Sequence, residues 1–255
     1  MSDSETATRE RYAKAAEAPE AALCCPVDYN PKFLEVIPEE VIEKDYGCGD
    51  PSQHLKAGET VLDLGSGTGK ICFIASQVVG PKGKVIGVDM TDEMLEVANR
   101  NAPIVAEQIG YANVEFRKGQ IQELKKAGIQ DDSIDTVVSN CVLNLVDNAE
   151  KEKLFGELYR VLKNGGRAVI SDIISDREVP KAMQDDPELW SGCISGAMTR
   201  KAFLMAFVGA GFDNVATLKL DQTPWQTIEG INFHAITVEA TKGASGDCCG
   251  DSGCC

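Results

Sequence analysis

Histidine, aromatic residues and long apolar runs are all scarce in this sequence. The chain has two histidines, His54 and His234, and aromatic residues make up 6% of it. Its most apolar stretch covers residues 202–212, whereas a membrane-spanning helix needs about 20 apolar residues. The N-terminal segment is polar and charged, without the apolar region of a secretory signal. We therefore expect no membrane segment and a cytoplasmic location.

Basic residues are also few relative to acidic ones. There are 25 Lys and Arg residues against 40 Asp and Glu residues, and the formal net charge is −15. Nucleic-acid phosphates and anionic lipids repel a chain this acidic, so we expect neither as a partner. The 255 residues are 43% hydrophobic, which provides a sizeable core and excludes disorder of the whole chain.

Short apolar strands alternate with helical segments from residue 60 onward. Five strands are predicted, at 61–64, 84–89, 113–116, 134–139 and 167–174. This alternation predicts a doubly wound α/β sheet, whose ligand site lies beyond the carboxyl ends of the strands. Two later strands, at 215–220 and 233–240, follow without a clear helix between them. We expect these two strands to pair antiparallel.

A glycine-rich turn follows the first strand, with the sequence Asp-Leu-Gly-Ser-Gly-Thr-Gly at 63–69. Its glycines let the backbone approach a ligand, and the helix behind them offers N–H groups to a carboxylate or a phosphate. Asp89 ends the next strand, where a carboxylate accepts the ribose hydroxyls of an adenosine. Lys70 stands where a dinucleotide-binding loop requires Gly or Ala, which excludes that form of the loop.

With Asp63 leading the loop, residues 58–175 resemble the class I S-adenosylmethionine-dependent methyltransferases. Further matches are Asp89-Met90, Gly119-Gln120-Ile121 and the segment 162–166 before the fifth strand. The resemblance implies a Rossmann-like sheet with an antiparallel last strand, and S-adenosylmethionine as the cofactor. We expect the cofactor site to include Tyr46, Asp63, Gly65, Ser66, Gly67, Gly69, Asp89, Met90, Gln120, Ile121 and Asn140. In this set, Tyr46 either holds the methionine end of the cofactor or packs at a helix end, and Asp63 either orients the loop or accepts the cofactor's ammonium.

The sequence contains ten cysteines. In a reducing cytosol, free thiols are favoured over structural disulfides. Cys48, Cys141 and Cys193 have Gly, Asn or Ser neighbours at predicted strand ends and loops, which indicates a functional role. Cys72 follows the glycine loop on a predicted helix, and we interpret it as a core residue.

Together with Leu-Cys-Cys-Pro at 23–26, these segments closely resemble the arsenite S-adenosylmethionine methyltransferases, over about residues 20–242. The resemblance implies that Cys48, Cys141 and Cys193 bind trivalent arsenic, and that Cys24 or Cys25 joins a redox cycle. Arsenite or methylarsenite is then the substrate, and thioredoxin or glutathione the reductant. Trivalent arsenic is soft and suits three sulfur ligands. Its lone pair carries no proton, so the reaction needs no general base.

Two other functions stay open. The first is methylation of a small organic acceptor such as a quinone precursor, with incidental cysteines. That acceptor would usually need a base, and neither histidine lies in a matched motif. The second is a non-catalytic, thiol-rich protein that sequesters metalloids on a decayed methyltransferase fold. The intact glycine loop and Asp89 argue against such decay.

We predict four segments. Residues 1–58 form an N-terminal helical lead-in and loops that carry three cysteines, and residues 59–175 form the S-adenosylmethionine-binding core. Residues 176–242 form a substrate-binding insertion and the closing strands. Residues 243–255 are a flexible tail with two vicinal cysteine pairs, which either scavenges arsenite or zinc or is functionally optional.

Overall fold

The computed structural model describes residues 3–18, 20, 27–44 and 46–243. The centre of this described part is a nine-stranded sheet with the order β3-β2-β1-β4-β5-β9-β7, to which β6 and β8 are attached at β5 and β9. The strands are β1 (Thr60–Leu64), β2 (Lys84–Asp89), β3 (Val114–Lys118), β4 (Ile134–Asn140), β5 (Leu162–Ser175), β6 (Met198–Thr199), β7 (Asn214–Leu220), β8 (Gln226–Ile228) and β9 (Ile231–Thr241).

The strand directions confirm the predicted doubly wound fold. β1 to β5 are parallel to one another, and β9 is antiparallel to both β5 and β7. The two late strands therefore pair antiparallel, as the missing helix between them predicts. β5 begins at Leu162, earlier than expected, because Leu162 already pairs with Ile134 before a register shift in the ladder.

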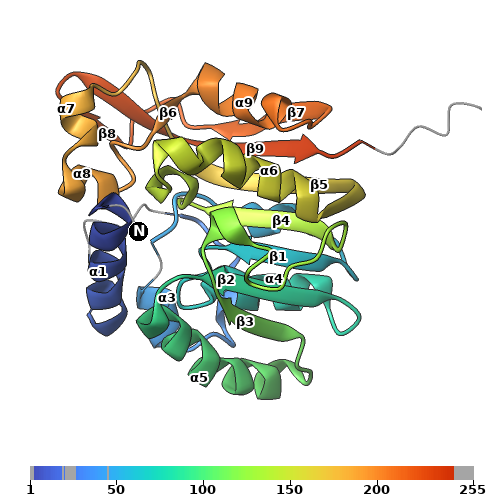
Figure 1. Cartoon of the computed structure of the whole chain (residues 1–255). Helices are drawn as coiled ribbons and strands as arrows, with labels where there is room; N and C mark the ends of the chain where they lie inside the picture. Colours follow the sequence, from blue (N-terminus) through green and yellow to red (C-terminus); the bar gives the residue numbers. More distant parts are fainter. Residues whose placement is uncertain (1–2, 19, 21–26, 45, 244–255) are drawn as a thin grey trace, which may run out of the picture.

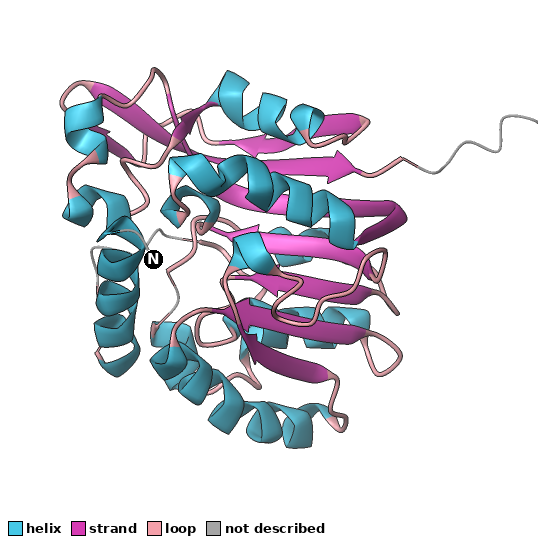
Figure 2. Ribbon diagram, in the orientation of Figure 1, coloured by secondary structure: helices cyan, strands magenta, loops and turns pink. Residues whose placement is uncertain are grey.

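Helices cover both faces of the sheet (Figure 2). They are α1 (Asp3–Glu17), α2 (Pro31–Leu34), α3 (Glu39–Glu43), α4 (Lys70–Val79), α5 (Asp92–Ile109), α6 (Lys151–Val161), α7 (Lys181–Gln184), α8 (Pro187–Ser191) and α9 (Arg200–Gly209). Successive strand residues point to opposite faces. Val61 accordingly packs in one apolar cluster with α4 and α5, and Leu62 packs in another with α6 and α9. This arrangement buries a large apolar cluster on each face of the sheet.

The N-terminal helix stands across the carboxyl ends of the central strands (Figure 1). α1 contacts α5 and α8, so it joins the core to the insertion between β5 and β6. The Arg11 guanidinium on α1 fixes this contact, because it donates to the Glu188 carbonyl at 2.9 Å and to Ser191 Oγ at 3.0 Å. No helix in the described part of the chain has the length and apolar character needed to cross a membrane.

Candidate active site

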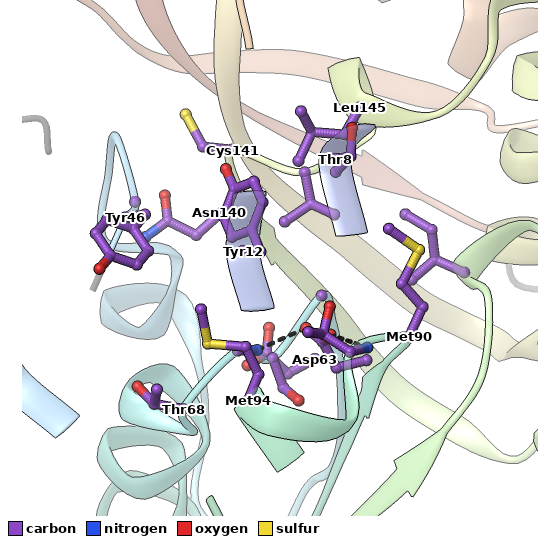
Figure 3. Close-up of a pocket in the computed structure, with 18 of the residues that line it drawn as sticks. Thr8, Tyr12, Tyr46, Asp63, Thr68, Met90, Met94, Asn140, Cys141 and Leu145 are labelled. Carbon is purple, nitrogen blue, oxygen red and sulfur yellow. Dashed lines mark hydrogen bonds between the residues drawn. The ribbon is translucent and has the colours of Figure 1, made fainter. Parts of the chain in front are cut away.

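A pocket opens at the carboxyl ends of the strands, beneath α1, with an empty volume of about 950 Å³ that is partly open to solvent. It lies where a doubly wound sheet places its ligand. The expected cofactor residues that line it are Tyr46, Asp63, Gly65, Ser66, Gly67, Asp89, Met90, Gln120, Ile121 and Asn140. Figure 3 shows Asp63, Met90 and Met94 on one side of this pocket, with Thr8 and Tyr12 on the other.

Two glycines of the glycine loop differ in their surroundings, since Gly67 faces the pocket and Gly69 packs against the core. Gly67 has a φ of +52°, and a Cβ there would meet open space, so its backbone faces the pocket. Gly69, also expected at the cofactor site, does not line the pocket. It caps α4 with a φ of +94°, and a Cβ there would lie 2.7 Å from the Phe116 ring. Both positions favour glycine because other residues are strained at positive φ.

Asp89 has the geometry of a ribose acceptor. Its Oδ2 accepts from the Gly67 N–H at 2.8 Å, and its Oδ1 accepts from the Thr91 N–H at 2.8 Å. Burial raises the pKa of Asp89, and these N–H groups oppose that rise. Each carboxylate oxygen has a further lone pair. The carboxylate can therefore accept hydroxyl groups from a ligand while it still holds the loop.

Two hydroxyl groups on the pocket wall point to a polar ligand. Ser66 Oγ and Thr8 Oγ1 are buried and have no hydrogen-bond partner among the described residues. Buried polar atoms are nearly always paired with protein, water or ligand. Together with the Asp89 carboxylate and the open glycine backbone, they fit a ligand that carries several hydrogen-bonding groups. S-adenosylmethionine, with its ribose, adenine and amino-acid groups, is such a ligand.

Cys72 is fully buried on α4, as expected for a core cysteine. Its Sγ donates to Asp63 Oδ2 at 3.2 Å. Burial raises the pKa of the Cys72 thiol, and the charge of Asp63 raises it further. The thiol therefore stays protonated and helps to orient the carboxylate that leads the glycine loop.

The structure brings together Cys48, Cys141 and Cys193 from three distant loops. All three lie in one buried cluster and are between 4% and 6% exposed, so their loop positions are nevertheless enclosed. Cys193 carries a thiol, and its Sγ donates to the Cys141 carbonyl at 2.9 Å. The remaining two expected cysteines, Cys24 and Cys25, lie outside the described residues.

The expectation of free thiols at all three positions is wrong, because Cys48 and Cys141 form a disulfide. Their Cα atoms are 5.8 Å apart, which is within the usual span of a disulfide. Sequence reasoning missed this pairing because the two residues are separated by 93 positions. In the part of the chain that the structure describes, no group of three or more His, Cys, Asp or Glu side chains has the arrangement of a metal site.

Two of these cysteines have strained backbones. Cys141 and Cys193 each have a φ of +62°, and they are two of only four described non-glycine residues with positive φ. Such a conformation costs about 1–3 kcal/mol and is found preferentially at functional sites. The positive φ of both cysteines is therefore a reason, separate from the sequence resemblance, to treat this cluster as a candidate functional site.

Asn140 lines the pocket, but its amide is engaged by the loop that carries Cys48. Its Oδ1 accepts from the N–H groups of Cys48 at 2.9 Å and Gly49 at 3.0 Å. Its Nδ2 donates to the Gly49 carbonyl at 2.7 Å and to the Tyr29 hydroxyl at 3.1 Å. The residue expected to bind the cofactor therefore holds Cys48 beside Cys141.

Tyr46 connects the pocket to the N-terminal helix. Its hydroxyl donates to the Ala15 carbonyl at 2.9 Å and accepts from the Glu20 N–H at 3.2 Å. Its ring meets the Tyr12 ring edge-on, with centroids 6.0 Å apart. Tyr46 thus lines the pocket and packs beneath a helix, as one of its two expected roles has it, and its contact with the cofactor stays a prediction.

Sequence reasoning missed the pocket residues on α1. Glu5 Oε1 accepts from Gln122 Nε2 at 2.8 Å, and Thr8 and Tyr12 line the same wall. Burial raises the pKa of Tyr12 strongly, and its contact with Cys193 adds to that rise. The available signal was spacing, because residues 5, 8, 12 and 15 repeat every three to four positions on one helix face.

The histidines have no part in the pocket. Neither His54 nor His234 lines it. His54 ends a short 3-10 helix, and His234 Nδ1 lies 3.0 Å from the Asp221 carbonyl.

Comparisons with known proteins agree with this architecture. A family described as "Methyltransferase domain" matches residues 55–229. The chain therefore belongs to the methyltransferase domain family.

More specific similarity extends over most of the chain. It is 34% identical to the arsenic(III) S-adenosylmethionine methyltransferase from Chlamydomonas reinhardtii, with a TM-score of 0.76, covering 89% of this chain and 76% of that structure. The arsenite methyltransferase of Halobacterium salinarum is 42% identical over 210 residues, which are 79% of this chain and 51% of that protein. That of Mus musculus is 40% identical over 217 residues, with coverages of 84% and 57%. The chain thus spans about half the length of the curated relatives it matches.

Proposed function

We propose that the protein transfers a methyl group from S-adenosylmethionine to trivalent arsenic, and so detoxifies arsenite. The observation that carries the proposal is the convergence of Cys48, Cys141 and Cys193 beside the pocket of the glycine loop. Arsenite methyltransferases of comparable sequence support the same substrate. Methylarsenite is a second substrate if methylation proceeds further.

The pocket residues divide the work of holding the cofactor. S-adenosylmethionine supplies an electrophilic methyl group on a sulfonium ion. Asp89 accepts ribose hydroxyls, and the N–H groups in the first turn of α4, which have no partner within the helix, suit the carboxylate end. Ser66 Oγ and Thr8 Oγ1 gain the partners that they lack among the described residues. Asp63, which leads the glycine loop, contributes negative charge to the pocket wall.

Three cysteines suit arsenic by charge as well as by softness. Each thiol that binds arsenite displaces one hydroxyl group as water, so three thiols release three waters. The resulting complex has three thiolates around a trivalent ion and is neutral. Burial of this neutral complex in an apolar cluster costs far less free energy than burial of three separate thiolates. This agrees with the low exposure of all three cysteines.

Arsenic bound by three sulfurs retains a lone pair, which acts as the nucleophile. This lone pair carries no proton, so the protein needs to position and desolvate it rather than deprotonate it. The absence of both histidines from the pocket lining fits that requirement. The cysteine residues therefore perform the main catalytic task, which is to aim the arsenic.

Methyl transfer raises arsenic from the trivalent to the pentavalent state, so two electrons must be returned. Two thiolates that become one disulfide release two electrons. The disulfide between Cys48 and Cys141 supports this role for the two residues, because their sulfurs lie in contact. A thiol reductant such as thioredoxin or glutathione then restores the thiols, with Cys24 or Cys25 as the proposed relay.

Two remaining assignments belong to this proposal. Residues 176–242 act as the substrate-binding unit, because Cys193 lies in that part of the chain. The cytoplasmic location follows from the need for reducing conditions that keep the cysteines able to bind arsenic.

A methyltransferase for a small organic acceptor is the competing function. Part of the chain is 36% identical, over 119 residues, to a ubiquinone/menaquinone biosynthesis C-methyltransferase of Vibrio vulnificus. That similarity covers 45% of this chain. The strained cysteine cluster favours arsenic, because an organic acceptor gives no reason for three converging sulfurs.

The test is methyl transfer from radiolabelled S-adenosylmethionine, in the presence of a thiol reductant, with three acceptor conditions. These are arsenite, a demethylated quinol and no acceptor. We expect labelled products only in the arsenite condition, and chromatography should identify them as methylarsenicals. Label in the quinol would favour the competing enzyme. Arsenite binding without any labelled product would favour a sequestering protein.

A second test separates arsenic binding from redox cycling. Methylarsenite has two valences left for sulfur, and we assign them to Cys141 and Cys193. Cys48→Ser should therefore lose activity on arsenite but keep it on methylarsenite under strong thiol reductant. Equal loss on both substrates would contradict this division between the cysteines.

A further inference from the structure

Cys141 and Cys193 lie on two neighbouring segments that are joined by hydrogen bonds from side chains to backbone carbonyls. The segments are the turn at 141–145 and the stretch at 190–196. Besides the bond from Cys193 Sγ to the Cys141 carbonyl, Trp190 Nε1 donates to the Leu145 carbonyl at 3.1 Å. The distance between the two cysteines therefore depends on how these segments are held together.

Lys151 lies beneath this junction, at the start of α6. It is 7% exposed, and its Nζ donates to the Gly196 carbonyl at 2.5 Å. The same atom lies 6.0 Å from the centre of the Trp190 ring. Burial lowers the pKa of Lys151 to about 8, and the charge of Asp172 opposes that change. Lysine is rarely buried because desolvation of its ammonium is costly, so this position needs a reason.

Asp172, on β5, holds the other segment. Its Oδ2 accepts from the Leu143 N–H at 2.9 Å, and its Oδ1 accepts from Asn144 Nδ2 at 2.9 Å. Asn144 Nδ2 also donates to the Ile173 carbonyl at 2.6 Å. The turn that follows Cys141 is thereby tied to the sheet.

The two held segments touch at Gly196. A Cβ at this glycine would lie 1.9 Å from the Asn144 carbonyl oxygen, so the backbones are in close contact. Lys151 thus binds one segment at Gly196, and Gly196 contacts the turn that Asp172 binds. Neither charged residue lines the pocket, and neither has a task in the proposed methyl transfer.

We propose that Lys151 and Asp172 form a buried brace that sets the spacing between Cys141 and Cys193. Both residues are positioning residues, since they act on the arsenic site through the backbone of the two segments. The part of this inference that concerns arsenic affinity rests on the proposed function. The spacing itself does not.

The test compares two variants of the brace with one control. Lys151→Met removes the hydrogen bond and the charge at similar side-chain length. Gly196→Ala keeps the charge but forces the two segments apart. Lys153→Met is the control on the same helix, because Lys153 is 48% exposed and pairs with Glu123 and Glu150 at the surface.

Binding of arsenite and of S-adenosylmethionine is measured by equilibrium dialysis on the reduced full chain. We expect Lys151→Met to weaken arsenite binding about tenfold, as for loss of a buried hydrogen bond to a charged group, and Gly196→Ala to weaken it to a similar extent by separating the segments. Binding of S-adenosylmethionine should stay within about twofold of the original protein. Lys153→Met should change neither. A parallel loss of both ligands, or no loss of arsenite, would overturn the brace.

A second readout does not depend on arsenic. Dibromobimane links two thiols only when they are close, and peptide mass spectrometry counts the Cys141–Cys193 link in the reduced Cys48→Ser protein. We expect the yield to fall in both brace variants and to be unchanged in the control. An unchanged yield would overturn the inference. If the original protein binds no arsenite but the yield falls as expected, the proposed function fails and the brace stands.

Discussion

Substitution of Asn140 most sharply distinguishes two roles for this residue, which are binding the cofactor and positioning Cys48. Asn140→Ala removes four hydrogen bonds at once, three of them to the backbone of Cys48 and Gly49. The loop that carries Cys48 is then held by fewer contacts. Binding of arsenite should suffer, and binding of S-adenosylmethionine should change little.

The magnitude follows from the bonds lost. One intramolecular hydrogen bond contributes about 0.5–1.5 kcal/mol, so the three bonds to the loop contribute about 1.5–4.5 kcal/mol. We expect a decrease of this size in the free energy of unfolding of the reduced protein. Since the loop must be reordered when arsenic binds, arsenite affinity should fall by about tenfold or more.

The assays are urea denaturation for stability and calorimetry for each ligand. Asn140→Asp serves as the comparison, because its carboxylate still accepts from the Cys48 and Gly49 N–H groups but cannot donate to the Gly49 carbonyl. It should lose less arsenite affinity than the alanine variant. A larger loss of S-adenosylmethionine affinity than of arsenite affinity would refute the positioning role and restore Asn140 to the cofactor site.

Four further outcomes are expected. Asp89→Ala should weaken S-adenosylmethionine binding by about 1.5–3 kcal/mol in calorimetry, because the ribose loses a charged acceptor. Cys141→Ser should abolish arsenite methylation, whereas Cys72→Ser should keep most activity, because serine still donates to the neighbouring carboxylate. Burial raises the pKa of Asp172 to about 6, so the folded state holds this proton more tightly than the unfolded chain. The free energy of unfolding should therefore fall as pH rises from about 4 to about 6, and Asp172→Asn should remove that fall in urea titrations. Tyr12→Phe should raise the KM for arsenite more than the KM for S-adenosylmethionine, since its hydroxyl contacts a cysteine of the arsenic cluster.

The parallel core could be predicted from sequence because its signals are local. Each strand is a short apolar run, and the glycine loop and Asp89 occupy fixed positions relative to such runs. The carboxyl ends of parallel strands meet at one edge of the sheet, so the pocket lining followed from the strand order. Gly69 is the one expected cofactor residue outside the pocket lining, and it lies against Phe116 of β3, a strand far from the loop in sequence.

The remainder of the site depends on contacts between distant segments. Cys48 pairs with Cys141 across 93 positions, and its loop is bound by the Asn140 amide, which no periodicity reveals. The N-terminal helix looked like a charged lead-in because its outer face is polar. Its inner face carries Thr8 and Tyr12 at helical spacing, but their target became apparent only with the sheet in place.

Arsenic K-edge X-ray absorption on the reduced protein with bound arsenite most directly tests the central claim. We expect a first shell of three sulfur atoms without oxygen in the original protein. Cys193→Ser should show oxygen or water in place of one sulfur. A first shell in the original protein that retains oxygen, or one that is unchanged by Cys193→Ser, would contradict the site formed by Cys48, Cys141 and Cys193.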